Sequence, residues 1–366
     1  MFVPIRFCKS MNQAEPRAGR RKRGGAAVLR MRVLVSFLVA CVCAVASSAQ
    51  TSGDLALGLS EFSKGNFSSA VALFARAEEA APGTTDALLY ESKAYIHLEQ
   101  FTAAEGALQR YLLAHATSGD ALYLLGYVLH REGKATESLE TYTKAAQHRI
   151  PAGDDLKIVG LNYVLLNDYP DAIKWLEKAV EAEPKNKEAW YFLGRAYYTK
   201  SRVPEARKAF LTVLELDPHD TKAENNLGLI LESEALPDEA MDAYRKAIQW
   251  QEQSVRPSEQ PYLNLGSLLM EQSRVGDAIP LLQKAVELAP GDAICRLKLG
   301  TAYLRLGKLA DAQRDLEKAV QLAPDDPAAH YQLGKLYKEM KALDRAKAEF
   351  DRTAELQSRA ASSKPQ

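Results

Sequence analysis

Cysteine is scarce in this sequence, and its placement excludes a disulfide framework. Three of the four cysteines, Cys8, Cys41 and Cys43, lie within the first 49 residues. Only Cys295 remains beyond them, so the rest of the chain cannot form an intramolecular disulfide in any compartment. We expect Cys295 to be an inert thiol rather than a reactive one.

Extended hydrophobic runs are also few. The run Val33–Ala46 is shorter than the roughly 20 residues that a membrane-spanning helix needs. A basic segment precedes it, and Ser47-Ser48-Ala49 supplies the small residues that signal cleavage requires. The pattern predicts an export leader over residues 1–49, with its core at 31–49 and cleavage after Ala49. The mature chain would then be periplasmic, located in the envelope, or secreted.

Three alternatives for this leader stay open. Met31 can be the true start, because Met31–Ala49 alone forms a complete short signal. The segment 33–46 can also stay uncleaved as a membrane anchor, which would be the chain's only membrane contact. Finally, Leu38-Val39-Ala40-Cys41 resembles the lipobox of bacterial lipoproteins, which would make Cys41 a lipidation site.

Charge of one sign is not in excess, since the chain holds 47 basic and 47 acidic residues. Nine of the basic residues and one of the acidic residues fall in residues 1–50. Residues 51–366 therefore hold 38 basic and 46 acidic residues, a net charge of −8. A mildly acidic body argues against a nucleic-acid partner.

Signatures of catalysis are missing as well. The sequence contains no phosphate-binding glycine loop, no HExxH, no CxxC and no GxSxG. None of the six histidines pairs with another histidine or cysteine at metal-ligand spacing. We therefore expect no enzyme activity, no cofactor and no metal site.

What the sequence does contain is a repeat. Numbering the stretch from Lys187 to Asp220 as 1 to 34 places Gly194 at position 8, Ala206 at position 20 and Phe210 at position 24. Positions 4, 7, 8 and 11 share a face of one helix, and positions 20 and 24 share a face of a second. Position 8 recurs as Gly58, Ser92, Gly126, Gly160, Gly194, Gly228, Gly266, Gly300 and Gly334. Position 20 recurs as Ala70, Ala104, Ser138, Ala172, Ala206, Ala240, Ala278, Ala312 and Ala346. Small side chains in fixed phase let the two helix backbones approach closely.

This pattern resembles the tetratricopeptide repeat (TPR), a helix–turn–helix unit with a 34-residue period. The resemblance implies an all-α fold, a right-handed α-solenoid superhelix of about nine units. Repeats one to six occupy residues 51–254, an insertion takes 255–258, and repeats seven to nine occupy 259–360. The sixth repeat lacks a terminating proline, so we expect its second helix to be about one turn longer. Residues 361–366 are expected to form a disordered tail.

The resemblance also implies a binding surface. In this class the first helices line the concave face, with positions 2, 5, 6, 9, 12 and 13 pointing into the groove. An aromatic and cationic set, typical of interface residues, comes first in the chain. An amide-rich set follows and resembles the asparagine ladder with which some TPR proteins hold extended peptides. The candidate groove residues are Tyr123, Tyr127, His130, Lys157, Tyr191, Arg195, Tyr198, Asn225, Asn226, Asn264 and Lys298.

These features favour a non-catalytic, exported scaffold that binds an extended segment of a protein or peptide partner. The first alternative is a membrane- or lipid-anchored TPR adaptor of an envelope assembly or translocation machine. The second is a polysaccharide-binding groove or an enzyme subunit, because aromatic grooves also stack on sugars. Lys157 occupies position 5, but Leu161 stands where chaperone-tail-binding TPR domains carry asparagine, which excludes that partner class.

Overall fold

The structure is a computed structural model that describes residues 53–83 and 86–362. The predicted leader, its cleavage site and Gln50 lie outside the described residues. Within the described ranges the chain is built from α-helices and turns without a β-strand, so the predicted all-α class is confirmed. No helix in these ranges combines the length and the apolar character needed to cross a membrane.

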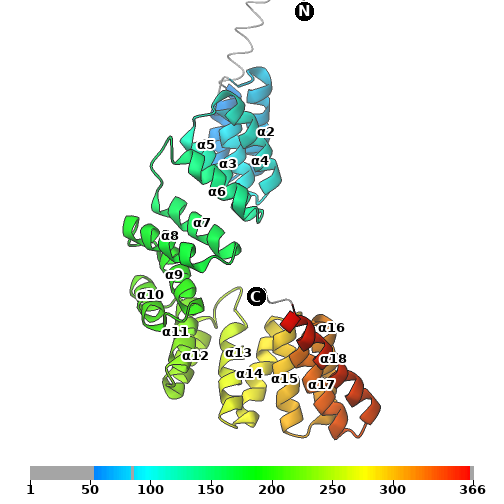
Figure 1. The fold of residues 1–366 in the computed structure, drawn as a ribbon. Helices are drawn as coiled ribbons and strands as arrows, with labels where there is room; N and C mark the ends of the chain where they lie inside the picture. Colours follow the sequence, from blue (N-terminus) through cyan, green and yellow to red (C-terminus); the bar gives the residue numbers. More distant parts are fainter. Residues whose placement is uncertain (1–52, 84–85, 363–366) are drawn as a thin grey trace, which may run out of the picture. The chain divides into compact units, whose positions relative to one another are not determined.

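The helices form nine consecutive antiparallel pairs in the described residues (Figure 1). The first pair is the helical stretch 53–63 with α2 (Phe67–Ala80), and the second is α3 (Ala87–His97) with α4 (Phe101–Ala114). The next three pairs are α5 (Gly119–Arg131) with α6 (Ala135–Ala145), α7 (Gly153–Leu165) with α8 (Tyr169–Ala182), and α9 (Lys187–Thr199) with α10 (Val203–Leu216). The sixth and seventh are α11 (Thr221–Ser233) with α12 (Pro237–Trp250) and α13 (Gln260–Glu271) with α14 (Val275–Leu288). The last two are α15 (Ala293–Arg305) with α16 (Leu309–Leu322) and α17 (Pro327–Glu339) with α18 (Leu343–Ser362).

The chain divides into two compact units at residue 116. Repeats one and two belong to the first unit, and repeats three to nine belong to the second. Every feature of the candidate site described below lies within the second unit.

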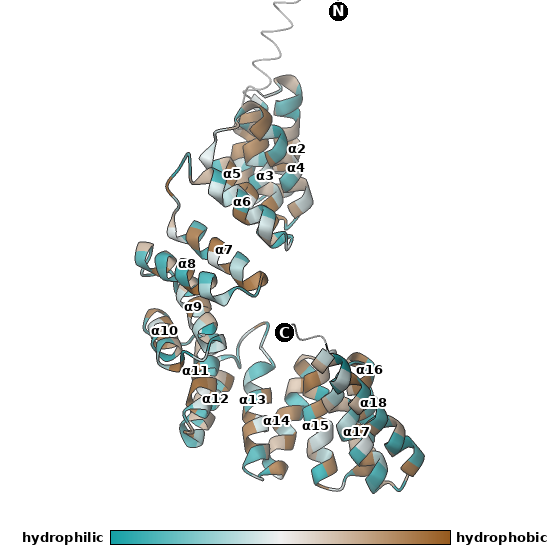
Figure 2. Ribbon diagram, in the orientation of Figure 1, coloured by the Kyte–Doolittle hydropathy of each residue, from teal (hydrophilic) through white to brown (hydrophobic). Residues whose placement is uncertain are grey.

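The two helices of a pair pack through the predicted small-residue positions. At position 8, a Cβ added to each glycine would collide with the side chain at position 24 of the same repeat, as Gly228 shows against Tyr244. The position-20 side chains are buried in all nine repeats, and Ala206 is fully buried. Each helix consequently presents an apolar side to its neighbours and a polar side to solvent, which Figure 2 shows as alternating hydrophobic and hydrophilic segments along the ribbons.

Polar residues at several helix starts cap the helices. Asn186, Asp220 and Asp326 accept hydrogen bonds from backbone amides in the first turns of α9, α11 and α17. The helices end before prolines such as Pro218, which cannot continue the hydrogen-bonded ladder. The start of α13 differs, because its N-cap is Glu259 and makes no side-chain cap bond.

Two predicted helix ends are wrong. The second helix of repeat six, α12, has 14 residues, the same length as α10 and α14, so it gains no extra turn. The extra residues form a loop instead. It is closed by the buried Gln251, which donates to the Ser258 carbonyl and accepts from the Ser258 amide, both at 2.8 Å. The final helix, α18, has 20 residues and continues through Ser362, so residues 361–362 are helical rather than part of a disordered tail.

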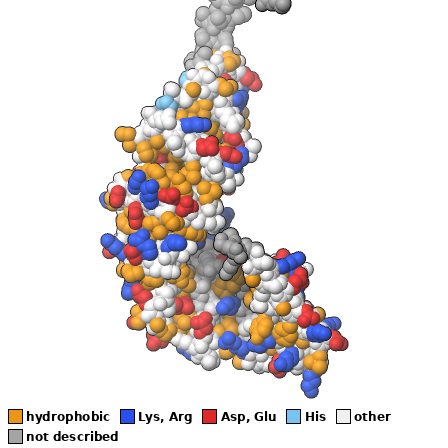
Figure 3. Space-filling view, in the orientation of Figure 1, with side chains coloured by type: hydrophobic (Ala, Val, Ile, Leu, Met, Phe, Trp, Pro, Cys, Tyr) orange, Lys and Arg blue, Asp and Glu red, His pale blue; other side chains and the backbone are white. Residues whose placement is uncertain are grey.

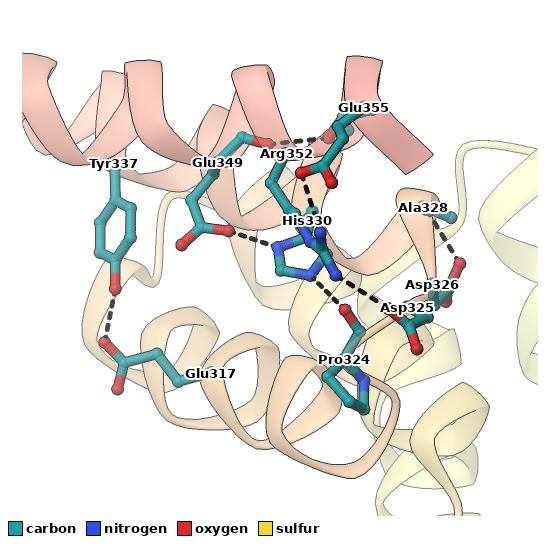
Figure 4. A network of polar contacts seen from close by, with 11 residues as sticks. Glu317, Pro324, Asp325, Asp326, Ala328, His330, Tyr337, Glu349, Arg352 and Glu355 are labelled. Carbon is teal, nitrogen blue, oxygen red and sulfur yellow. Dashed lines mark hydrogen bonds and ion pairs between the residues drawn. The ribbon is translucent and has the colours of Figure 1, made fainter. Parts of the chain in front are cut away.

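Charged and polar pairs supplement the apolar contacts between helices. Asp315 is fully buried and accepts from Arg296 at 2.6 Å, which ties α15 to α16. In the last repeat, Nδ1 of His330 lies 2.6 Å from Glu349, and Nε2 lies 3.0 Å from the Pro324 carbonyl oxygen (Figure 4).

A second type of polar tie recurs between repeats. The Tyr197 hydroxyl donates to Glu177 of the preceding repeat, and Tyr337 donates to Glu317 at the same spacing of 20 residues. Because these tyrosines share position 11 and their acceptors share position 25, the repeat carries a periodic polar link as well as a periodic core.

Candidate functional site

In repeats three to nine, the first helices of consecutive repeats contact one another and together form one face of the stack. Helix α7 contacts α5 and α9, α11 contacts α9 and α13, and α15 contacts α13 and α17. In the described residues no comparable packing joins consecutive second helices such as α8 and α10. The first-helix face is therefore where a ligand can contact several repeats at once.

Two neighbouring cavities open on this face. The first, which we call the apolar cavity, has a volume of about 260 Å³ and is bounded by α5, α7, α9 and the start of α8. Its lining is His130, Leu161, Val164, Leu165, Tyr169, Phe192, Arg195, Ala196 and Thr199. Hydrophobic side chains supply most of this lining, so the cavity suits an apolar group.

The second cavity, which we call the amide cavity, has a volume of about 320 Å³ and is bounded by α9, α11 and α13. Its lining is Tyr191, Arg195, Thr221, Lys222, Asn225, Asn226, Leu229, Ser258, Gln260 and Pro261. Amide and hydroxyl groups predominate, and these can both donate to and accept from a peptide backbone. Arg195 lines both cavities, so the two form adjacent parts of one surface.

The His130 ring is held by a buried polar network. Nδ1 of His130 lies 2.8 Å from Oδ1 of Asn162, and Nδ2 of Asn162 donates to Ser138 at 2.7 Å. Ser138 in turn donates to the Gly126 carbonyl at 2.6 Å. Burial lowers the pKa of His130, although its bond to Asn162 acts in the opposite direction. The imidazole at the wall of the apolar cavity is therefore biased toward its neutral form.

Three of the eleven predicted groove residues are buried in internal contacts. The Tyr123 hydroxyl donates to the Arg149 carbonyl at 2.8 Å, and the Tyr123 side chain is 4% exposed. The Lys157 ammonium is 2.8 Å from Asp154 and 2.8 Å from Glu188 of the next repeat, and these two carboxylates raise its pKa against the opposing effect of burial. For Tyr123 and Lys157, the expectation that they point freely into the groove is incorrect.

The third, Asn225, is buried yet still lines the amide cavity. Its Oδ1 accepts from Nδ2 of Asn264 at 3.0 Å, which links repeats six and seven. Asn226 donates to the Lys222 carbonyl at 2.7 Å and lies 3.4 Å from the Tyr191 hydroxyl. The predicted amide set therefore does come together, as an internal network at the cavity wall.

The remaining predicted residues lie near these cavities or apart from them. Tyr191 and Arg195 line the amide cavity, and His130 lines the apolar one. Tyr127 accepts from Arg131 at 2.8 Å, whereas Tyr198 is half-buried beside the apolar core. Lys298, on α15, contributes no lining to either cavity.

Sequence reasoning missed two contributors. Lys222, at position 2 of repeat six, lines the amide cavity, and its place in the pattern could have identified it. Asn162, at position 10, holds His130 in place, but only the neighbouring second helix reveals its partner Ser138. In the residues that the structure describes, no group of three or more His, Cys, Asp or Glu side chains has a metal-binding arrangement.

Charges on the molecular surface are mixed. Figure 3 shows basic and acidic side chains interspersed on the visible face rather than gathered into a field of one sign. Many of them pair within one helix, as Asp311 and Arg314 do in α16.

Comparison with protein families confirms the repeat. The tetratricopeptide repeat family matches residues 55–119, 91–155, 160–221 and 201–254, and two further forms of the repeat match 258–325 and 305–361. The chain belongs to the tetratricopeptide repeat family. Proteins of this architecture typically serve as interaction scaffolds, because stacked repeats present an extended binding surface.

Individual relatives share only part of the chain. A TPR repeat-containing protein of Methanocaldococcus jannaschii is 24% identical over 173 residues, which cover 44% of this chain and 30% of that protein. The cytochrome c-type biogenesis protein CycH of Pseudomonas aeruginosa is 31% identical over 118 residues, which cover 32% of this chain and 28% of that protein. The chain thus spans less than a third of either relative.

Two solved structures share the fold. The Cut9–Hcn1 hetero-tetramer of the APC/C aligns with a TM-score of 0.58 at 15% identity, covering 74% of this chain and 52% of that chain. A tetratricopeptide repeat protein from Parabacteroides merdae aligns with a TM-score of 0.56 at 19% identity, covering 69% and 97%.

Proposed function

We propose that this protein is a non-catalytic scaffold that binds an extended segment of a partner protein on the first-helix face of repeats three to seven. The observation that carries the proposal is the placement of the two cavities. Both are lined by side chains from consecutive first helices, and Arg195 joins them. A ligand that fills both must be elongated and must run across several repeats, as an extended peptide does.

The chemistry of the lining supports a peptide. An apolar cavity takes a side chain, and Asn225, Asn226 and Gln260 of the amide cavity can hydrogen-bond a backbone. The surface uses rigid aromatic groups and an arginine, which dominate the energetics of protein interfaces.

We also propose that the chain is exported through its leader. The support is the basic segment, the run Val33–Ala46 and the small residues before Gln50. The mass and N-terminal sequence of the protein recovered from its native cells test this. A start at Gln50 is expected, whereas an intact leader or a lipidated Cys41 would replace export with anchoring.

The binding proposal is tested with the full chain on an array of blocked, unrelated peptides about 12 residues long, next to a glycan array. We expect a subset of peptides to bind the wild-type protein. A variant that combines Tyr127→Ala, Arg195→Gln and Asn226→Ala should lose that binding while its helical circular-dichroism signal and melting stay unchanged.

The matched control alters three exposed residues of second helices, Lys144→Gln, Lys208→Gln and Gln249→Ala, and should bind as the wild type does. Normal binding by the first-helix variant would refute the assignment of the surface. Glycan binding without any peptide binding would refute the proposed function itself.

A further inference from the structure

Arg195 differs from nearly every other arginine in the molecule. Within residues 53–83 and 86–362, Arg195 and Arg256 are the only arginines for which the structure records no ion pair, hydrogen bond or ring contact of the side chain. Arg256 lies in the exposed insertion loop, whereas Arg195 stands between the apolar cavity and the amide cavity. A guanidinium left without a carboxylate partner at a cavity is available to an incoming one.

The fully charged residues that line the two cavities, Arg195 and Lys222, are both basic. Neither cavity is lined by an Asp or Glu, and the second cation at the amide cavity, Lys222, forms no ion pair with any described residue. Acidic side chains outnumber basic ones by eight in residues 51–366. The two adjacent cavities therefore carry a local positive charge on a chain that is acidic overall. Such a positive surface complements an anionic ligand.

The apolar cavity indicates what accompanies that charge. Its volume of about 260 Å³ is below the range of about 300–1,000 Å³ that is typical of small-molecule sites. Leu161, Val164 and Phe192 contribute to its walls. The size and lining suit one aliphatic or aromatic side chain better than a whole cofactor.

The amide cavity indicates how the rest of the ligand is held. Oδ1 of Asn225 is occupied by Asn264, and Nδ2 of Asn226 by the Lys222 carbonyl. In the described part of the chain no hydrogen bond engages Nδ2 of Asn225 or Oδ1 of Asn226. One donor and one acceptor therefore remain, which is the pair that an extended backbone presents.

We propose that the ligand of this surface is an acidic extended peptide with one apolar anchor. The anchor side chain enters the apolar cavity, a neighbouring Asp or Glu pairs with Arg195, and the following backbone bonds to Asn225 and Asn226. A further acidic residue on the same peptide meets Lys222. This inference rests on the proposed function, because it specifies which peptides the scaffold selects.

The test measures fluorescence anisotropy of the full chain with four pools of labelled nine-residue peptides. Each pool is acetylated and amidated, so that only side chains carry charge. The first pool fixes Leu between two Glu in a background of Ser, Thr, Gly and Asn. The others replace both Glu by Gln, both Glu by Lys, or Leu by Ala.

We expect the Glu–Leu pool to bind best. One exposed ion pair contributes about 0.2–1 kcal/mol, so the Glu pool should bind up to about five-fold tighter than the Gln pool and tighter still than the Lys pool. This preference should shrink as NaCl is raised from about 0.05 M to about 0.5 M. Replacement of Leu by Ala should weaken binding.

Arg195→Glu should weaken the binding of the Glu pool and strengthen the binding of the Lys pool relative to the wild type, while the unchanged Lys222 still favours an acidic residue. The control is Lys335→Glu, which makes the same charge change at position 9 of repeat nine, where the exposed Lys335 lines neither cavity. Lys335→Glu should leave the order of the pools unchanged, and circular dichroism verifies that both variants fold.

Each other outcome is decisive. Equal binding of the Glu, Gln and Lys pools overturns the acidic specificity but leaves the peptide scaffold standing. A Glu preference as large in Arg195→Glu as in the wild type would show that Arg195 does not contact the ligand. Equal binding of the Leu and Ala pools would show that no apolar anchor side chain contributes to binding. Failure of all four pools to bind overturns the acidic, anchored ligand, and failure of the unrelated peptide array as well overturns the proposed function.

Discussion

The close contact between Gly194 and Phe210 gives the sharpest test of how these repeats pack. A Cβ placed on Gly194 would lie 2.9 Å from Cε1 and 3.0 Å from Cζ of Phe210. The Phe210 ring has no room to withdraw, because it is fully buried and packs edge-to-face with Tyr191, with ring centroids 6.0 Å apart. The perturbation is Gly194→Leu, which adds this Cβ and three further carbons.

Two effects of this substitution oppose each other. Leucine in place of glycine gains about 0.8 kcal/mol of intrinsic helix stability. Overpacking of a closed core costs about 1–3 kcal/mol, and four added carbons place Gly194→Leu at the upper end. We therefore expect a net loss of about 1–2 kcal/mol in the free energy of unfolding. Because repeats contact mainly their neighbours, the loss should concentrate in repeats four to six.

The assay is urea unfolding of the full chain, followed by circular dichroism at the helical band. The control is Gly276→Leu on α14, where an added Cβ would meet no atom within 4 Å. We expect a lower and broader transition for Gly194→Leu, and an unchanged or slightly higher midpoint for Gly276→Leu. A Gly194→Leu midpoint equal to or above the wild type would refute the packing argument.

Three further predictions concern buried polar groups. Asp315→Ala leaves the guanidinium of Arg296 without its 2.6 Å partner and should lower the unfolding free energy by about 2 kcal/mol; a urea midpoint equal to the wild type would contradict this. Burial raises the pKa of Glu224 despite its ion pair with Lys246. At a pH just above the unfolded-state pKa, the Glu224 carboxyl is therefore still protonated in the folded protein. The contribution of Glu224 to stability is then full below the unfolded pKa and is lost as the pH rises through the folded pKa. Glu224→Gln should therefore become steadily more stable than the wild type in urea titrations as the pH is raised from about 4.5, and parallel curves would exclude the effect. Burial also raises the pKa of Cys295 to about 12, so a thiol reagent should modify Cys295 only after denaturation, and rapid labelling of the native protein would show that the thiol is accessible.

The candidate site was only partly predictable from first-helix positions. Tyr191, Arg195 and Asn226 were expected on the ligand-facing surface and do line a cavity there. Tyr123 and Lys157 occupy equivalent positions but are buried, because each finds an acceptor in another segment. Helical periodicity specifies the side of the helix, whereas the partners that hold a side chain inward come from other parts of the chain.

Some helix boundaries were likewise predictable from the local sequence, whereas others depend on contacts with residues farther along the chain. Capping residues such as Asn186 and Asp220 indicate where α9 and α11 begin, because their side chains satisfy amides only a few residues away. The absence of a proline after α12 suggested a longer helix, yet Gln251 closes the loop by bonding to Ser258 seven residues on. A missing stop signal therefore did not extend the helix once a tertiary contact offered an alternative.

The sequence by itself determined the fold class, the nine helix pairs of the described chain and the glycine contacts within each pair. These features depend on the spacing of residues along one chain, and the 34-residue period of the sequence specifies that spacing. Only the tertiary structure decided which polar residues satisfy one another and which stay open, as Lys157 and Arg195 illustrate. The physical reason is that a long side chain reaches partners in a neighbouring repeat, and the position of such partners is set by packing rather than by the local pattern.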